Sequence, residues 1–319
     1  MGELARIAAV DIGTVTTRLL IADVGDSGVT EVARSTDITH LGEGLTVTGR
    51  LGDAAMGRVV DVARRYVATA RELGAERIVT VATSASRDAL NGDEFREALQ
   101  QVGLVPSIID GAREAELAFA GATFSQSGEG LLVVDCGGGS TELVSGSAVA
   151  EADGRVTRID VARSIDVGSR RMTELFLASD PPTGEELEAA RTWAAEELRG
   201  YFDRLDARPS RMIALAGTAT TLAAIQMGLE TYDAEKVHGF ELTGSDLAEL
   251  LELLASLPLE SRKRVVGLHP ERAGVIVAGA LIFETVLALA GLDGMIVSEH
   301  DILYGILFDA FADLRESGR

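Results

Sequence analysis

Short apolar runs alternate along this chain with longer segments in which apolar residues recur at helical spacing. The runs at 7–11, 78–82 and 131–135 have the length of buried strands, and the segment 53–73 carries the single apolar stripe of a helix. Strands that alternate with helices are typical of α/β proteins. The pattern therefore predicts an α/β fold.

Other elements follow from the same periodicities and from capping residues. Asp53 is a reasonable cap for the first long helix. Thr183 and Glu186 form a capping box that starts another helix. A less regular region is expected between residues 24 and 52. The remaining predicted strands are 18–23, 105–109 and 295–297, and the remaining helices are 93–101, one that opens near Glu114, 169–177, 183–205, 247–254, an apolar one opened by Pro270, and 300–314.

One pattern occurs in both halves of the chain. Residues 7–20 and 131–144 each contain a buried strand ending near an Asp, a turn of Gly, Ser and Thr, and a second apolar strand. A second pair, 78–86 and 212–220, follows in the same order. Strands followed by glycine turns are common in α/β proteins, but an ordered pair of repeats predicts two related domains. Equivalent positions are Asp11 and Asp135, Gly13 and Gly137, Thr16 and Ser140, and Thr17 and Thr141.

Each repeated turn combines groups that suit a phosphate. Glycine lets backbone N–H groups approach an anion closely, and Ser and Thr hydroxyls add donors. The Asp near the strand end supplies a fixed negative charge for a metal ion or a water molecule. Two such turns in related halves predict a phosphate held across a cleft between two domains.

Composition limits the possible partners and compartments. The 319 residues suffice for two domains, and the net charge of −21 argues against nonspecific nucleic-acid binding. The apolar stretch 273–292 is interrupted by Glu284, so we expect no membrane span. The single cysteine, Cys136, allows no internal disulfide and is expected to be a small buried residue rather than a catalytic thiol. With no signal-peptide pattern at the N-terminus, these features predict a cytoplasmic protein.

The polar, glycine-containing stretch 125–130 is the best candidate for a hinge between domains. We therefore expect one domain over residues 1–124 and a second over residues 125–299. The terminal helix at 300–319 is expected to pack back on the first domain.

Six motifs that occur in order identify a family. The set closely resembles the exopolyphosphatase/guanosine pentaphosphate phosphohydrolase family, a branch of the actin-like and sugar-kinase-like superfamily. The resemblance covers nearly the whole chain and implies the short form of the family, with two ribonuclease-H-like domains around a central cleft. The motifs are Asp11-x-Gly13-Thr14-x-Thr16-x-Arg18, Ala82-Thr83-Ser84-Ala85-x-Arg87-x-Ala89-x-Asn91, Gly111-x-x-Glu114-Ala115, Asp135-x-Gly137-Gly138-Gly139-Ser140-Thr141-Glu142, Gly217-Thr218-Ala219-Thr220-Thr221 and Pro270-Glu271-Arg272-Ala273.

The resemblance assigns the carboxylates of these motifs. Glu114 matches the general base that deprotonates the attacking water, although a Glu in the first turn of a helix can also be merely solvated. Asp135 and Glu142 are candidate ligands of Mg²⁺, or of Mn²⁺. Asp11 is the mirror position in the first domain. The alternative for Asp135 is a purely structural role in closing its loop.

The loops and nearby arginines are the candidate phosphate-binding groups. Arginine suits bidentate contact with phosphate, whereas a surface salt bridge is the alternative for each arginine. A local cluster of such cations, or a bound divalent cation, has to overcome the overall negative charge. The candidates are Thr14, Thr16, Thr17, Arg18, Arg87, Gly137, Gly138, Gly139, Ser140, Thr141, Gly217, Thr218 and Arg272.

Two departures from the family bear on the substrate. Thr220 stands where some members carry a Lys, and the segment 301–305 replaces an Arg-x-Gly ending found in many members. Fewer cations favour short polyphosphate chains. The four histidines have no paired metal-ligand spacing, and no Gly-x-Ser-x-Gly sequence indicates a serine hydrolase.

We therefore expect metal-dependent release of terminal phosphate from inorganic polyphosphate. Guanosine pentaphosphate, which would lose its terminal 5′ phosphate, is the alternative substrate. An ATP-dependent small-molecule kinase and a nucleotide-binding regulator without turnover are the alternatives from other classes. A symmetric homodimer is the expected assembly on general grounds.

Overall fold

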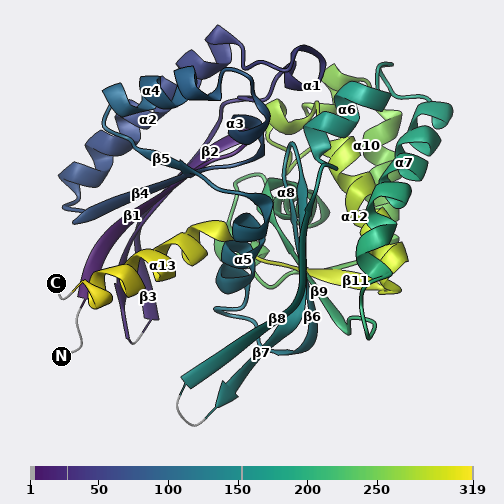
Figure 1. Ribbon diagram of the computed structural model, residues 1–319. Coiled ribbons are helices and arrows are strands. Elements are labelled where there is room, and N and C mark those ends of the chain that lie inside the picture. Colours follow the sequence, from purple (N-terminus) through teal and green to yellow (C-terminus); the bar gives the residue numbers. More distant parts are fainter. Residues whose placement is uncertain (1–3, 27, 152–153, 318–319) are drawn as a thin grey trace. The chain divides into compact units, whose positions relative to one another are not determined.

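The computed structural model describes residues 4–26, 28–151 and 154–317, and their contacts divide the chain into two compact units (Figure 1). Unit 1 comprises Met1–Gly121 and Ile302–Arg319, and unit 2 comprises Ala122–Asp301. The chain thus passes between the units twice. The first passage precedes the stretch expected as a hinge, and Gly128–Gly130 of that stretch already belongs to a strand.

Unit 1 is a five-stranded mixed sheet with helices on its faces. The strand order is β3-β2-β1-β4-β5, in which β1, β2 and β3 are antiparallel neighbours and β4 and β5 run parallel to β1. The elements are β1 (Leu4–Ile12), β2 (Thr16–Gly25), β3 (Gly28–Ile38), α1 (Leu45–Thr48), α2 (Asp53–Glu72), β4 (Arg77–Ala82), α3 (Ser84–Asp88), α4 (Gly92–Gln101), β5 (Pro106–Ile108), α5 (Gly111–Ala122) and α13 (Ile302–Glu316).

The terminal helix α13 belongs to unit 1. Ala8, Val10 and Ile12 of β1 share a core with α2 and α4. Helix α13 contacts β1 and β2, and the Tyr304 hydroxyl donates a 2.8 Å hydrogen bond to Glu31 of β3. The last residues of the chain therefore complete the packing of the first sheet (Figure 1).

Unit 2 repeats this architecture with one added strand. In its order β10-β11-β9-β6-β7-β8, the last five strands match β5, β4, β1, β2 and β3 in position and direction. The predicted pair of related α/β domains is thereby confirmed. The elements are β6 (Gly128–Cys136), β7 (Thr141–Glu151), β8 (Gly154–Ile165), α6 (Ser169–Phe176), α7 (Gly184–Phe202), β9 (Arg211–Leu215), α8 (Ala216–Gln226), α9 (Ala234–Val237), β10 (Glu241–Thr243), α10 (Gly244–Ser256), α11 (Leu259–Arg262), η1 (Pro270–Arg272), α12 (Ile276–Ala290) and β11 (Gly294–Val297).

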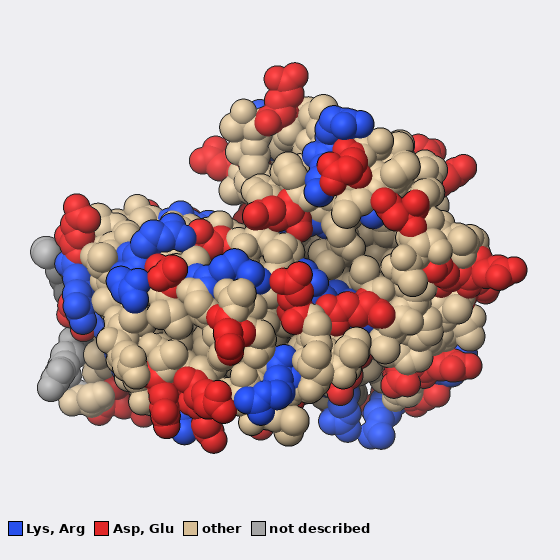
Figure 2. Space-filling model, turned by 90° about the horizontal axis from the view of Figure 1, so that it is seen from above, with Lys and Arg blue, Asp and Glu red and all other residues tan. Residues whose placement is uncertain are grey.

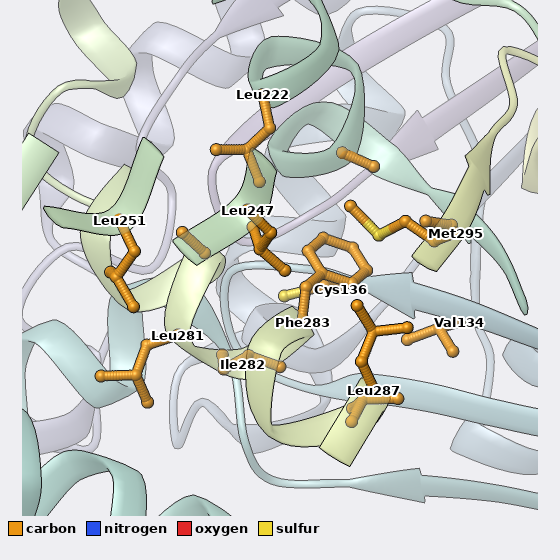
Figure 3. Packing of buried hydrophobic residues seen from close by; sticks show 14 of the residues in the cluster. Val134, Cys136, Leu222, Leu247, Leu251, Leu281, Ile282, Phe283, Leu287 and Met295 are labelled. Carbon is orange, nitrogen blue, oxygen red and sulfur yellow. The ribbon is translucent and has the colours of Figure 1, made fainter. Parts of the chain in front are cut away.

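The core of unit 2 forms around α12, which is apolar on nearly every side and is therefore buried. Figure 3 shows Phe283 of this helix beside Leu247 of α10 and Cys136 of β6. Burial raises the pKa of the Cys136 thiol to about 12, so the thiol stays protonated at neutral pH. The expectation that Cys136 is a small buried residue is confirmed.

Four local predictions require correction, and one is confirmed. The region expected to be irregular contains β3, and β8 was also not predicted. Both strands are half-exposed, and each is the last of three consecutive antiparallel strands. Pro270 opens a short 3₁₀ turn, and the apolar helix begins only at Ile276. Gly52, not Asp53, is the cap of α2. The capping box of Thr183 and Glu186 is confirmed.

None of the helices in the described part of the chain is both long enough and apolar enough to cross a membrane.

Candidate functional site

The two repeated turns have the same backbone geometry. We call residues 13–16 the first loop and residues 137–140 the second loop. The N–H of Gly13 donates to the Thr16 carbonyl at 2.9 Å, and the N–H of Gly137 donates to the Ser140 carbonyl at 3.0 Å. Each loop joins two antiparallel strands in the same register, so equivalent positions can be compared directly.

The carbonyls of the second loop point toward the start of α6. Their donors are three consecutive residues that follow β8. Gly137 accepts from Ser169 N at 2.9 Å and Ser169 Oγ at 3.2 Å, Gly138 accepts from Arg170 N at 2.9 Å and Arg171 N at 3.1 Å, and Gly139 accepts from Arg171 Nε at 2.8 Å.

This arrangement fixes the direction of the loop's N–H groups. In a trans peptide the C=O and the following N–H point in opposite directions. The N–H groups of Gly138, Gly139 and Ser140 therefore point away from α6. Successive N–H groups that point the same way form a concavity that binds anions. The second loop therefore presents the kind of N–H arrangement that can bind an anion.

Sequence reasoning missed the residues that support this loop. A Cβ at Gly168 would overlap the backbone of Gly138 and Gly139, so only glycine permits the close approach. Ser169 and Arg171 supply hydrogen bonds to the loop carbonyls. The available signal was a glycine followed by polar residues at the end of a strand, which has no specificity on its own.

The first loop is supported in the same manner by the segment 39–42. The Thr14 carbonyl accepts from the N–H of Gly42, and the Val15 carbonyl accepts from the N–H groups of residues 39 and 40, each at 2.9 Å. By the same geometry, the N–H groups of Val15 and Thr16 point away from that segment. Both units therefore carry a loop whose carbonyls are bonded to the segment behind it.

The charged pair beside each loop differs between the units. Asp11 pairs across the hairpin with Arg18, whose Nη2 and Nε lie 2.6 and 3.0 Å from Asp11 Oδ2. Asp135 pairs in the same register with Glu142, whose Oε1 accepts from Ser164 Oγ at 2.6 Å. Directly opposite residues have neighbouring side chains, and like charges there are destabilising unless a cation intervenes.

This difference decides which carboxylates fit a metal. Asp135 and Glu142 offer hard oxygen donors on adjacent strands, which suit Mg²⁺. Asp11 fits less well, because the Arg18 guanidinium already supplies the positive charge. Within residues 4–26, 28–151 and 154–317, no three His, Cys, Asp or Glu side chains converge. Two protein carboxylates completed by phosphate oxygens and water match the usual coordination of Mg²⁺.

Two of the predicted phosphate ligands face the wrong way. Thr17 and Thr141 are fully buried, at 0% exposure. The Thr17 hydroxyl bonds to that of Thr39 at 3.0 Å, and the Thr141 hydroxyl donates to the Val167 carbonyl at 2.5 Å. These hydroxyls tie each loop to the segment behind it and do not reach a ligand.

Glu114 and Arg87 come together at one edge of the first sheet. Glu114 lies in the first turn of α5, and its side chain is 10% exposed. Arg87 Nη1 donates to Glu114 Oε2 at 3.3 Å and to the Ile109 carbonyl at 3.0 Å. Because β1, β4 and β5 are parallel, their carboxyl ends lie at the same end of the sheet. The first loop, Arg87 and Glu114 each follow one of these strands and therefore lie at that end. Functional groups gather at such edges in α/β proteins.

Gly217 and Arg272 meet at the corresponding edge of the second sheet. Asp135 pairs with Leu215, so the start of α8 lies next to the second loop. A Cβ at Gly217 would overlap the Arg272 guanidinium, and Arg272 Nη1 lies 3.5 Å from Thr221 Oγ1. Thr218, by contrast, packs against Gly279 of α12 and is buried. The glycine thus makes room for the arginine.

Comparisons with known proteins agree with this architecture. A model of the Ppx/GppA phosphatase family matches residues 20–313. Exopolyphosphatase 2 of Mycobacterium tuberculosis is 39% identical over 321 residues, which cover 95% of this chain and 98% of that protein. A solved exopolyphosphatase-like protein superposes with a TM-score of 0.90 at 34% identity, covering 97% of this chain and 98% of that one. The Aquifex aeolicus member of the Ppx/GppA family superposes with a TM-score of 0.80 at 33% identity, covering 98% and 99%.

Proposed function

This chain belongs to the Ppx/GppA phosphatase family, and from that premise we propose that it hydrolyses the terminal phosphoanhydride bond of inorganic polyphosphate. The observation that carries the proposal is the second loop. Its three outward N–H groups lie beside two carboxylates, Asp135 and Glu142. N–H donors next to two carboxylates offer ligands for a phosphate and for a divalent cation bound to it.

Substrate binding is assigned to both loops and to nearby cations. The N–H groups of Gly138, Gly139 and Ser140 take one phosphate, and the first loop takes another through its N–H groups and the hydroxyls of Thr14 and Thr16. Arginines then neutralise the remaining oxygens. These cations are Arg18, Arg87 and Arg272, the last of which lies on Gly217.

Asp135 and Glu142 are the residues that would hold a divalent metal, Mg²⁺ or Mn²⁺. When bound, such an ion neutralises phosphate charge and polarises the phosphorus toward attack. Asp11 has a different task in this scheme, because it orients Arg18 through the hydrogen bonds at 2.6 and 3.0 Å. In this scheme the first domain supplies Arg18 and Arg87, and the second supplies Arg272 and the metal ligands.

Glu114 accepts the proton of the attacking water. The water oxygen forms a bond to the terminal phosphorus, and the bond from that phosphorus to the bridging oxygen breaks. The products are orthophosphate and a chain one phosphate shorter. Arg87 holds the Glu114 carboxylate in place through the bond at 3.3 Å. Positioning of the base and the phosphate supplies most of the catalysis expected for this reaction class.

Phosphate release measured per chain end tests the proposal. The substrates are polyphosphates of several lengths, guanosine pentaphosphate and ATP, each with Mg²⁺ and with excess chelator. We expect polyphosphate to give the highest kcat/KM, and only with metal. The Glu114→Gln variant, purified identically, controls for contaminating phosphatases. Faster release from guanosine pentaphosphate would assign the alternative substrate, and phosphate transfer to an acceptor in place of water would indicate a kinase.

A further inference from the structure

We propose that Arg171 is a positioning residue for the reaction, because its guanidinium aims the N–H of Ser140 at the substrate phosphate. The inference rests on the proposed function. It goes beyond the family motifs, since Arg171 lies outside all six of them.

The three peptides of the second loop are held by different kinds of group. Backbone N–H groups at the start of α6 bind the carbonyls of Gly137 and Gly138. The Gly139 carbonyl instead accepts from a side chain, at 2.8 Å from Arg171 Nε. A hydrogen bond from a backbone N–H persists after any substitution other than proline. A hydrogen bond from a side chain depends on the identity of that residue. The orientation of the peptide between Gly139 and Ser140 therefore depends on a side chain, and a substitution of that side chain can change it.

The peptide between Gly139 and Ser140 can also rotate easily unless a hydrogen bond holds it. A glycine accepts many backbone conformations, so the plane between Gly139 and Ser140 can rotate at low cost. Rotation that turned the carbonyl away from α6 would turn the Ser140 N–H away from the phosphate. The hydrogen bond from Arg171 opposes that rotation, and the N–H is then oriented before substrate arrives.

Arg171 is itself held rigidly. Its backbone N–H donates to the Gly138 carbonyl at 3.1 Å, so one residue fixes two adjacent peptides. Its side chain is 21% exposed, with Nη2 3.9 Å from Asp166 Oδ1. The next residue, Met172, is fully buried in the core of unit 2 and anchors the helix. A planar guanidinium on a fixed helix gives a direction that the flexible ammonium of a lysine does not.

The test combines Arg171→Lys, which keeps the charge, with Arg171→Ala, which leaves space for added guanidinium. Arg163→Lys is the matched control, because Arg163 is an exposed arginine on β8 whose Nη1 donates to the carbonyl of the neighbouring Ala162. The measurements are kcat and KM for polyphosphate, the affinity for inorganic phosphate by calorimetry, and the melting temperature.

We expect Arg171→Lys to lower kcat/KM by about tenfold or more, which is less than the roughly 10²–10³-fold loss seen when an oriented donor is removed, because the Ser140 N–H is still present. Phosphate affinity should fall in parallel, the melting temperature should stay near wild type, and guanidinium should restore much of the activity of Arg171→Ala. Arg163→Lys should behave as wild type.

Two results would overturn the proposal. One is an Arg171→Lys enzyme with wild-type kcat/KM and phosphate affinity. The other is loss of activity that tracks a lowered melting temperature in both variants and that guanidinium does not restore, which would indicate a structural role alone. A wild-type protein that binds phosphate but releases none from polyphosphate would contradict the proposed function instead, and calorimetry would still measure the role of Arg171.

Discussion

The first and second loops have the same backbone hydrogen bond, and the pair of charged residues beside them differs. Asp11 faces Arg18 in unit 1, and Asp135 faces Glu142 in unit 2, at the same position of the same hairpin. All three carboxylates are buried, at 2 to 6% exposure. A repeated fold has therefore kept its anion-binding geometry and reversed a single charge beside it.

We infer that the difference in charge gives the two loops different functions, phosphate binding and metal binding. An Asp bound to an arginine has its charge compensated within the protein, so the first loop offers N–H groups and a cation to phosphate. Two carboxylates on adjacent strands instead offer a pair of hard oxygen ligands, which suit a divalent cation. We infer that the metal binds at the second loop and that the first loop binds phosphate without it.

Removal of the base should have the largest effect. Glu114→Gln should lower turnover by about 10²–10⁴-fold, because the amide cannot accept the proton. The metal concentration needed for half-maximal activity should not change, because Glu114 is not one of the proposed metal ligands. Steady-state kinetics with a metal titration measure both. Glu116→Gln is the control, because Glu116 is exposed and bound to Arg113. A Glu114→Gln enzyme with more than about half of wild-type turnover would refute the assignment.

Removing Arg18 from its ion pair with Asp11 should lower the free energy of unfolding. Arg18→Gln leaves the Asp11 carboxylate, 3% exposed, without its guanidinium partner. Breaking a buried ion pair costs on the order of 3 kcal/mol of unfolding free energy. Replacing both partners, as in Asp11→Asn/Arg18→Gln, should recover most of that loss. Denaturant unfolding of the three proteins decides the point, and equal stability of wild type and Arg18→Gln would show that the pair contributes little.

The smallest effect concerns chain length. Acidic side chains are spread across the face shown in Figure 2, with basic ones between them, and the net charge is −21. Phosphates beyond the bound end should therefore meet a repulsive field. We expect kcat/KM per chain end to be a few-fold lower for long than for short polyphosphate at low salt, a gap that should narrow at about 0.15 M ionic strength.

A single added cation sharpens this test. Thr220 is half-buried in α8. Thr220→Lys should improve the use of long chains more than that of short ones. A wild-type preference for long chains at low salt would instead indicate a basic binding surface.

The sequence was sufficient to predict features that depend on local pattern. The paired loops follow from glycine, hydroxyl and Asp residues at fixed spacing, and the structure gives both loops the same hydrogen bond, at 2.9 and 3.0 Å. Strands β3 and β8 were missed because exposed strands at the end of a hairpin carry little hydrophobic signal.

Other features depend on tertiary contacts. Arg171 reaches Gly139 from a helix that starts 30 residues beyond it, counting from Gly139 to Ser169, and no local pattern indicates that bond. His238 and His300 are far apart in the chain, yet their ring centroids lie 4.2 Å apart, with the ring planes inclined by 38°. The burial of Thr17 and its bond to Thr39 follow from strand geometry, since the side chains of Thr16 and Thr17 face opposite sides of the sheet.

Binding of Mn²⁺ tests the central claim most directly, because it needs no substrate and no turnover. The affinity is measured by electron paramagnetic resonance for wild type and two matched double variants, Asp135→Asn/Glu142→Gln at the second loop and Asp11→Asn/Arg18→Gln at the first. Neutralising the second pair should weaken Mn²⁺ binding at least about tenfold, as expected for lost metal ligands, whereas neutralising the first should change it less than about twofold. Equal losses in both variants, or a loss confined to the first loop, would contradict the account.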